Sequence, residues 1–167
     1  MTENKYQAEQ LIINSGIPYI IFRPFWFFET LELIVRDGKD MLINKQLNQA
    51  HWITADDFAR MVAITYKKPE AKNKIFFVIG SEEYLIKDLL EEYCKHLYPE
   101  IKKVSTFPIG IIKMIAILTG NKDKKNDASL FGYFEKVKEM SNPDKTNELL
   151  GRPIITFEKW VSSKALL

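Results

Sequence analysis

Two short runs of residues without a polar face constrain the fold of this chain more than any other feature. Residues 19–22 read Tyr-Ile-Ile-Phe, and residues 75–79 read Ile-Phe-Phe-Val-Ile. β-branched and aromatic residues favour strands, and a strand that is apolar on both faces belongs in a sheet covered on both sides. Such sheets are mostly parallel. Residues 50–53 form a third, shorter strand candidate.

The remaining segments have mostly helical patterns. Apolar residues recur at helical spacing after Tyr6, and Ser15-Gly16 followed by Pro18 ends that helix. Thr54, with Asp57 three residues later, is a capping-box arrangement that starts a helix running to about Tyr66. We expect a helix over 25–36 that ends at Asp37-Gly38, and another from the turn at Gly80-Ser81 to residue 97. Three further helices are expected over 109–118, 130–140 and 156–165. A short strand at 103–107 and a polar loop at 121–127 complete the prediction. This order predicts an α/β fold followed by a helical tail.

Composition and charge exclude several classes of protein. A hydrophobic fraction of 46% and a charged fraction of 28% are typical of a globular chain and rule out disordered and collagen-like classes. The net charge of +2 is too balanced to indicate nucleic-acid binding. One cysteine, Cys94, and two histidines supply neither a disulfide framework nor a zinc site of the usual spacing.

Targeting signals and phosphate-binding glycines are both missing from the sequence. The longest apolar run, 109–118, is too short to span a bilayer, and no secretory signal is recognisable, so we expect a cytoplasmic protein. The seven glycines are separated by at least nine residues, which excludes a G-x-G-x-x-G turn and a P-loop. A bound phosphate would have to be held by other means or by another chain.

Several passages together resemble one family. Residues 5–11 (KYQAEQL) and 15–24 (SGIPYIIFRP) are similar to the K-x-x-x-E-x-x-L and S-G-I-x-Y-T-I-x-R-P passages of atypical short-chain dehydrogenases of the NmrA-like and NAD-dependent epimerase type. Residues 53–59 (ITADDFA) resemble a helix start of that family, residues 75–80 its last sheet strand, and residues 148–160 its closing L-G-x-P helix. The resemblance runs in order from Lys5 to about Trp160.

The resemblance implies a partial doubly wound (Rossmann-like) parallel sheet with a C-terminal helical substrate lobe, and NAD or NADP as cofactor. We expect a single domain, with the sheet part in residues 1–80 and the mostly helical lobe in residues 81–167. In this family the Gly-rich turn and the first strands precede the lysine that matches Lys5, so the chain looks like a C-terminal half. Many members also carry a proton-donating tyrosine four positions before that lysine, where this chain has Met1.

The resemblance also assigns candidate site residues. Lys5 would be the catalytic lysine at the nicotinamide ribose. A strand end at the carboxyl edge of an open α/β sheet is where ligands bind. The resemblance therefore assigns cofactor contacts to Arg23, Pro24 and Phe25, and substrate contacts to Trp26 and Phe28; no metal ligand is expected.

Each candidate also has a simpler interpretation. Lys5 could be a solvated terminal side chain, and Arg23 a strand-ending residue that reaches water. The aromatic residues 25–28 could be core or lid packing rather than the wall of a site. For Asp56 and Asp57, helix capping is favoured over a carboxylate pair, because adjacent residues on a helix do not face each other.

The remaining candidates favour structural roles. Cys94 and His96 point in different directions on a helix, so a core thiol is favoured over a nucleophilic pair. His51 is expected at the surface. The helix over 109–118 could be a substrate lid, a membrane-surface contact or a dimer face, with core packing favoured.

Two functions from different classes fit these features. The first is the substrate-side portion of an NAD(P)-dependent oxidoreductase- or epimerase-like protein that acts on a small molecule and is inactive alone, because it lacks the Gly-rich turn and the tyrosine. The alternative is a non-catalytic NmrA-like dinucleotide sensor or protein-interaction module. In either case we expect exposed sheet edges that favour self-association, with no nucleic-acid partner and no integral membrane segment.

Overall fold

The computed structural model describes residues 3–36, 39–40, 42–120, 122–137 and 142–165. The helices are α1 (Glu3–Asn14), α2 (Thr30–Ile34), α3 (Ala55–Thr65), α4 (Ile86–Leu97), α5 (Ile109–Thr119), α6 (Lys122–Phe134), α7 (Asp144–Leu150) and α8 (Phe157–Lys164), with a 3-10 turn at Pro69–Ala71. The strands are β1 (Ile20–Pro24), β2 (Trp26–Phe27), β3 (Val35–Arg36), β4 (Lys39–Asp40), β5 (Leu42–Ile43), β6 (Ala50–Ile53), β7 (Lys74–Val78), β8 (Glu82–Tyr84) and β9 (Thr106–Phe107).

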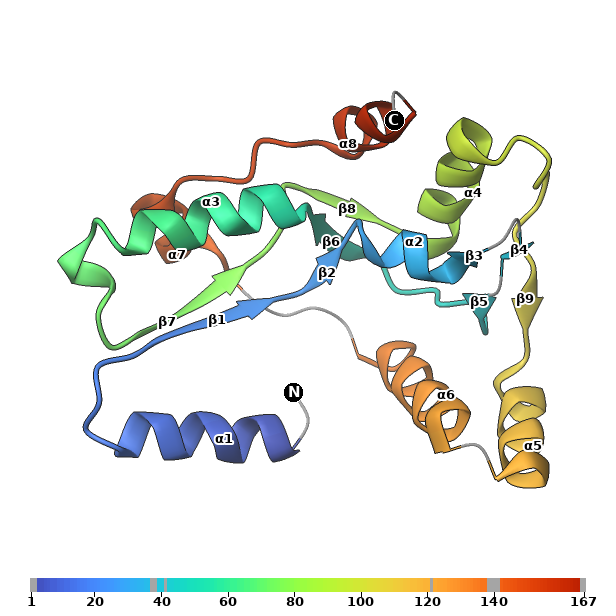
Figure 1. The fold of residues 1–167 in the computed structure, drawn as a ribbon, viewed down its shortest axis with the longest axis horizontal. Coiled ribbons are helices and arrows are strands. Elements are labelled where there is room, and N and C mark those ends of the chain that lie inside the picture. Colours follow the sequence, from blue (N-terminus) through green and yellow to red (C-terminus); the bar gives the residue numbers. More distant parts are fainter. Residues whose placement is uncertain (1–2, 37–38, 41, 121, 138–141, 166–167) are drawn as a thin grey trace.

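The two doubly apolar runs form a parallel strand pair at the centre of the molecule. β1 pairs with β7 in a register that runs from Ile20 opposite Lys74 to Pro24 opposite Val78. Helices α3 and α1 lie on opposite sides of this pair (Figure 1). The α/β class and the parallel, Rossmann-like sheet are therefore confirmed.

A second small sheet begins where β1 ends. After Phe25 the chain changes partner, because β2 pairs in parallel with β6, with Trp26 opposite Trp52. β8 then pairs with β6 on an antiparallel ladder. Gly80 is required beside this sheet, since a Cβ there would lie 1.6 Å from the backbone oxygen of Trp52.

The prediction of one helix over residues 25–36 is wrong. The segment instead forms β2, the short helix α2 and β3, and the Phe28 amide donates to the Ile53 carbonyl at 3.0 Å. Four consecutive aromatic residues favour a strand, and pairing with β6 outweighs the helical spacing of the apolar positions. The expected exit at Asp37-Gly38 lies outside the described residues.

Two further boundaries differ from the sequence prediction. The turn at Gly80-Ser81 does not lead directly into a helix, because β8 intervenes before α4 begins at Ile86. The residues from Lys122 to 127, predicted as a loop, form the first turns of α6, which ends at Phe134. No glycine or proline interrupts 122–131, so helix propensity explains the difference. Residues 121 and 138–140 of these predictions lie outside the described part.

Two clusters of buried side chains form the main core. One joins β2, α2, α4 and α8 and contains Phe28, Leu31, Leu90 and Trp160, each at most 5% exposed. The other joins α3, β7 and α7 around Met61. A fully buried leucine contributes about 1.5–3 kcal/mol relative to an exposed one, so α4 and α8 are firmly attached to the sheets.

The Thr54 half of the predicted capping box is confirmed, whereas the Asp57 side chain has a different role. Thr54 Oγ1 accepts a hydrogen bond from the Asp57 amide at 3.0 Å. The Asp57 carboxylate, 1% exposed, accepts hydrogen bonds of 2.8 Å from the amides of Ile154 and Ile155, and pairs with Arg60 at 2.9 Å. Asp57 therefore fastens the segment before α8 onto α3.

Within the described residues, no helix is both long enough and apolar enough to cross a bilayer.

Candidate functional site

Arg23, near the carboxyl end of β1, bonds to the middle of α1, and Pro24 and Phe25 follow it. The Arg23 Nε donates to Glu9 at 3.1 Å, and its Nη2 forms a second bond to the same carboxylate. The hydrogen bond that Arg23 donates to Glu9 raises the pKa of Arg23. The Arg23 guanidinium also lies 5.3 Å from the centre of the Phe77 ring. Arg23 is thus engaged in holding α1 against the sheet.

Lys5 lies on α1 one turn before Glu9. Residues four apart share a helix face, so the backbone of Lys5 is on the side of α1 that meets Arg23. α1 runs back along β1, which puts the Lys5 end of α1 at the same end as Pro24 (Figure 1). The Lys5 side chain is exposed. The position of Met1, where the family tyrosine would stand, lies outside the described residues.

The aromatic residues that follow β1 are divided between a cleft and the core. Trp26 stacks on Trp52 with ring centres 5.3 Å apart and contacts Phe134 at 4.7 Å. Phe28 is 1% exposed and packs on Trp160 with ring centres 5.5 Å apart. The structure therefore brings Phe25 and Trp26 to a cleft and places Phe28 in the core behind it. Core packing is confirmed for Phe28, and the interpretation of Phe25 and Trp26 as the wall of a site stays a prediction.

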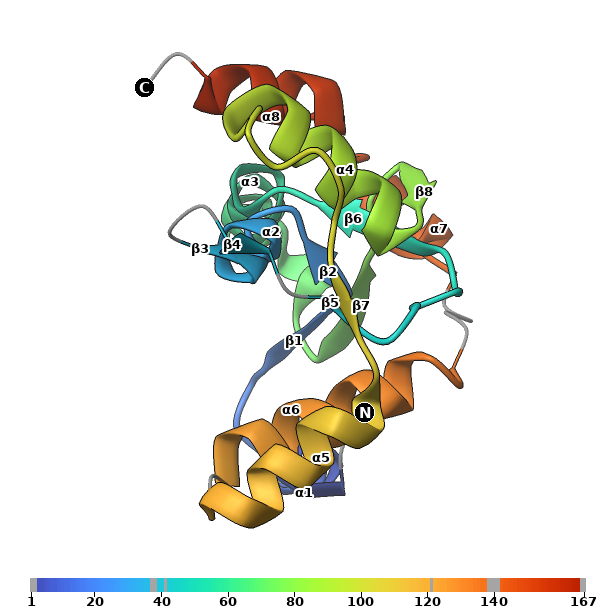
Figure 2. The same ribbon diagram turned by 90° about the vertical axis from the view of Figure 1, so that its right-hand side faces the viewer.

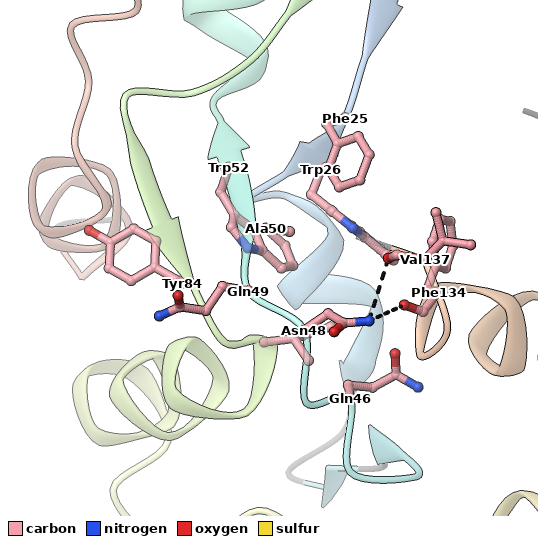
Figure 3. Close-up of a pocket in the computed structure, with 11 residues that line it drawn as sticks. Phe25, Trp26, Gln46, Asn48, Gln49, Ala50, Trp52, Tyr84, Phe134 and Val137 are labelled. Carbon is pink, nitrogen blue, oxygen red and sulfur yellow. Dashed lines mark hydrogen bonds between the residues drawn. The ribbon is translucent and has the colours of Figure 1, made fainter. Parts of the chain in front are cut away.

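This cleft is small, with a volume of about 30 Å³, and lies between β2, β6 and α6 (Figure 3). Its wall is mostly aromatic and aliphatic, with three amide side chains at one side. It is lined by Phe25, Trp26, Gln46, Asn48, Gln49, Ala50, Trp52, Tyr84, Ile86, Phe134 and Val137. Among the described residues that line it there is no carboxylate, lysine or arginine, so the environment suits an uncharged, largely apolar group.

One polar group in the wall is unsatisfied. Trp52 is 2% exposed, and its indole Nε1 has no hydrogen-bond acceptor among the described residues. Figure 3 shows this nitrogen on the Gln49 side of the ring. A buried donor without a partner costs about 1–3 kcal/mol, so an acceptor that reached it would recover part of that cost.

Sequence reasoning missed the loop that holds the cleft together. The Gln46 amide donates to the Ile43 and Phe131 carbonyls at 2.9 and 3.1 Å, and the Asn48 amide donates to the Phe134 and Glu135 carbonyls at 3.2 and 2.8 Å. The Asn48 bonds satisfy carbonyls at the end of α6 and just after it, whereas the Phe131 carbonyl also accepts from the Glu135 amide. The signal was available as four amides within residues 44–49.

The same loop has an unusual backbone. Asn44 and Gln46 have positive φ angles of 61° and 46°, a region that asparagine tolerates and other side chains rarely adopt. The buried hydrogen bonds of Gln46 offset the free-energy cost of this conformation. They also hold α6 in place as one wall of the cleft.

Tyr84 stands at the rim of the cleft and is a poor proton donor. Its hydroxyl donates to Glu82 at 2.6 Å. Burial, and then the hydrogen bond to Glu82, raise the pKa of Tyr84 above its ordinary value. The phenol therefore stays protonated at neutral pH, and it does not have the lowered pKa that would ease proton release.

The other candidates from the sequence occupy structural positions. Cys94 is 1% exposed in the core, as expected of a core thiol. His96 Nδ1 lies 2.8 Å from the Glu92 carbonyl on its own helix. His51 is partly exposed, with its Nδ1 3.6 Å from Glu83.

The residues that the resemblance assigns to a cofactor differ in how free they are. Lys5 is exposed and Pro24 and Phe25 are partly exposed, whereas Arg23 is already engaged by Glu9. No cradle of closely spaced glycines follows any described strand; the glycines with positive φ, at 16, 120 and 151, are isolated. The described residues therefore do not form a pyrophosphate site of the Gly-rich type.

Comparison with known proteins gives the family context. No family model matches the chain. It is 23% identical over 139 residues to the photosystem II assembly factor Ycf39 of Trieres chinensis, covering 81% of this chain and 40% of that protein. Ycf39 of Cyanophora paradoxa is 24% identical over 114 residues, covering 66% and 35%. The chain thus spans less than half the length of these curated relatives.

Solved structures share its fold. An NADPH-dependent quinone oxidoreductase from Escherichia coli superposes with a TM-score of 0.69 at 19% identity, covering 97% of this chain and 60% of that one. A nucleoside-diphosphate-sugar epimerase from Staphylococcus aureus gives 0.67 at 18%, covering 93% and 56%. A Citrobacter triphenylmethane reductase complexed with NADP(H) gives 0.66 at 16%, covering 96% and 57%. The chain shares the Rossmann-like fold of these reductases and this epimerase, as its resemblance implied.

Proposed function

We propose that this chain is the substrate-side portion of an NAD(P)-dependent oxidoreductase- or epimerase-like protein. The observation that carries the proposal is the position of the cleft: Phe25 and Trp26 follow directly on the carboxyl end of β1, the edge of an open α/β sheet where ligands bind. The Lys5 end of α1 lies at that same end. Cofactor and substrate would thus meet at the β1–β2 junction.

The roles we assign follow from this placement. Lys5 contacts the nicotinamide ribose, and Pro24 and Phe25 contact the nicotinamide end of the cofactor, with Arg23 holding α1 in position through Glu9. Trp26 lines the substrate cleft, and Phe28 supports it from the core. The nicotinamide, when bound, supplies a hydride donor or acceptor.

We propose that the phosphates of the cofactor are bound by residues outside this segment or by another chain. Among the described residues β1 pairs only with β7, and all five residues of β1 remain partly exposed although three of them are large and apolar. An open strand edge of this kind can accept a further parallel strand. We therefore propose that the chain is inactive alone, and that its open edge favours self-association in the cytoplasm.

A second candidate function is a non-catalytic sensor or interaction module. Two relatives are described as assembly factors rather than enzymes, which favours this alternative. The methionine at the position of the family tyrosine favours it as well.

Turnover by a version extended upstream distinguishes the two candidates. Oxidation of NADPH with a small quinone, dye or sugar-nucleotide acceptor supports the enzyme, whereas NADPH binding without turnover supports the sensor. In the same extended protein, Lys5→Gln should weaken NADPH binding by about tenfold, the value of one lost charge-assisted hydrogen bond. Lys95→Gln is the matched control, because Lys95 is 72% exposed on α4. Equal affinities of the two variants would contradict the role of Lys5.

A further inference from the structure

The indole nitrogens of Trp52 and Trp160 differ in their hydrogen bonding, although both residues are buried. Trp160 is 5% exposed, and its Nε1 donates to Glu29 Oε1 at 3.1 Å. Trp52 is 2% exposed, and its Nε1 has no acceptor among the described residues. A buried indole N–H usually has a hydrogen-bond partner, so the Trp52 nitrogen points to an acceptor that comes from outside the described chain.

The Trp52 ring is held so that its nitrogen does not turn towards another acceptor. β6 is the middle strand of its sheet, and Trp52 pairs with Trp26 of β2 on one side and with Glu82 of β8 on the other. The ring stacks on Trp26 and on Phe28, with ring centres 5.3 and 6.2 Å apart and interplanar angles of 24° and 13°. Because backbone and ring are both fixed, the nitrogen is a preorganised donor.

Trp52 belongs to the wall of the cleft between β2, β6 and α6. Figure 3 shows its nitrogen on the Gln49 side of the ring, and Gln49 is exposed, so the Gln49 side chain can move aside without disturbing the core. Figure 2 shows α5 and α6, here called the α5–α6 hairpin, at the end of the molecule opposite α4 and α8. Phe134 of α6 and Ile86 of α4 both line the cleft, so Trp52 lies between these two ends.

The size and charge of the cleft restrict what the acceptor can be. A cavity needs about 10–15 Å³ to hold one water, so about 30 Å³ admits a group of about two heavy atoms, such as C=O. Among the described lining residues there is no lysine or arginine, so a carboxylate or phosphate oxygen would be buried without a counter-charge. A carbonyl oxygen only accepts, whereas a hydroxyl also brings a donor that needs its own partner.

We propose that Trp52 is a ligand-binding residue, whose indole Nε1 donates a hydrogen bond to an uncharged carbonyl oxygen that enters the cleft. The rest of that molecule stays at the mouth of the cleft, against the partly exposed rings of Phe25 and Trp26. The hydrogen bond positions the carbonyl group and favours ketones over carboxylates. This inference rests on the proposed function, because it names the group that the substrate cleft accepts.

Nuclear magnetic resonance of the indole groups tests the proposal with the full chain and without cofactor. Titration with cyclopentanone should move the Trp52 indole N–H signal in a saturable way. The Trp160 signal should stay in place, because its N–H is already bonded to Glu29. Cyclopentanecarboxylate at the same concentration should leave both signals unchanged, because the cleft offers no counter-charge.

Substitution gives a second measurement. Trp52→Phe removes the indole N–H and keeps an aromatic ring, and should raise the Kd of cyclopentanone about fivefold, the value of one neutral hydrogen bond. Saturation transfer from protein to ketone measures this Kd without the indole signal. Trp160→Phe is the matched control, since it removes an indole N–H that lies outside the cleft. Circular dichroism shows whether both variants fold, and the titration of the unsubstituted chain decides if they do not.

The outcomes separate this inference from the proposed function. A saturable shift of the Trp52 signal, with weaker binding by Trp52→Phe alone, supports the Trp52 hydrogen bond even if an extended protein does not bind NADPH. A Trp52 signal that the ketone leaves unchanged overturns it, whatever the extended protein does, and so does an equal shift with the carboxylate. Magnetisation transfer from water to the Trp52 N–H that persists at saturating ketone also overturns it, because a resident water is then the acceptor.

Discussion

The central body, which holds the two main core clusters, and two peripheral parts, α1 and the α5–α6 hairpin, contain similar apolar residues but bury them to different extents. In the body, α4 alone buries Ile86, Leu89, Leu90, Tyr93 and Cys94. At the periphery, α1 buries none of its residues, and α5 buries only Ile112 and Ala116. The difference teaches that the body is stabilised by its own core, whereas α1 and the α5–α6 hairpin present apolar faces without partners in the described chain.

The largest expected effect is on the free energy of unfolding, when the same leucine-to-alanine substitution is made in the body and in the hairpin. Leu90→Ala removes a 0% exposed side chain and should lower the free energy of unfolding by about 3 kcal/mol. Leu118→Ala removes a 77% exposed side chain and should change it by less than about 0.5 kcal/mol. Urea denaturation followed by circular dichroism measures both, and similar losses would mean that the hairpin is part of the central core.

A slightly smaller effect is expected where the chain end joins the body. Asp57→Ala removes the acceptor of the Ile154 and Ile155 amides and the partner of Arg60, and should cost about 2–3 kcal/mol. Asp56→Ala is the control, because Asp56 is exposed on the same helix. A smaller loss for Asp57 than for Asp56 in the same urea experiment would refute the fastening role of Asp57.

The next largest loss of stability is expected where Asn48 attaches α6 to the body. Asn48→Ala leaves the Phe134 and Glu135 carbonyls without their donor and should cost about 1 kcal/mol. The loss should be local, so amide hydrogen exchange in α6 should speed up while that in α4 stays the same. Uniform acceleration in both helices would show that α6 opens only when the whole molecule unfolds. Leu47→Ala, 69% exposed in the same loop, is the control.

The smallest effect concerns alkaline pH. Because burial and Glu82 raise the pKa of Tyr84 in the folded state, its contribution to stability is complete below the unfolded pKa of about 10 and is lost as pH rises towards the folded value. Tyr84→Phe should therefore flatten the decline of stability above pH about 10. Tyr66→Phe, at an 87% exposed position, is the comparison, and an equal decline in wild type and Tyr84→Phe would contradict the assignment.

Local sequence patterns correctly predicted the elements whose residue types suit the pairing or capping that they make in the fold. The apolar runs at 19–22 and 75–79 became β1 and β7, and Thr54 caps α3 as its spacing indicated. The segment 25–36 failed because its partner, β6, comes from later in the chain, and a long-range ladder is not visible in local periodicity. β8 was missed for the same reason.

The candidate site was foreseen only in part. The position of Phe25 and Trp26 after a strand end could be inferred from the resemblance, and both line the cleft. The opposite wall could not be inferred, because Gln46 and Asn48 act by reaching α6 about 85 residues later in the chain. No observation tests the roles towards a cofactor or substrate of Lys5, Arg23, Pro24, Phe25, Trp26 and Phe28, which stay predictions.

Fluorescence titration of NADPH and NADH tests the central claim most directly, comparing this chain with a version that extends upstream. We predict no saturable binding by the chain alone and saturable binding by the extended protein, because the described residues contact at most the nicotinamide end. Tight, saturable binding by the chain alone would contradict the claim that the grip on the phosphates lies outside this segment.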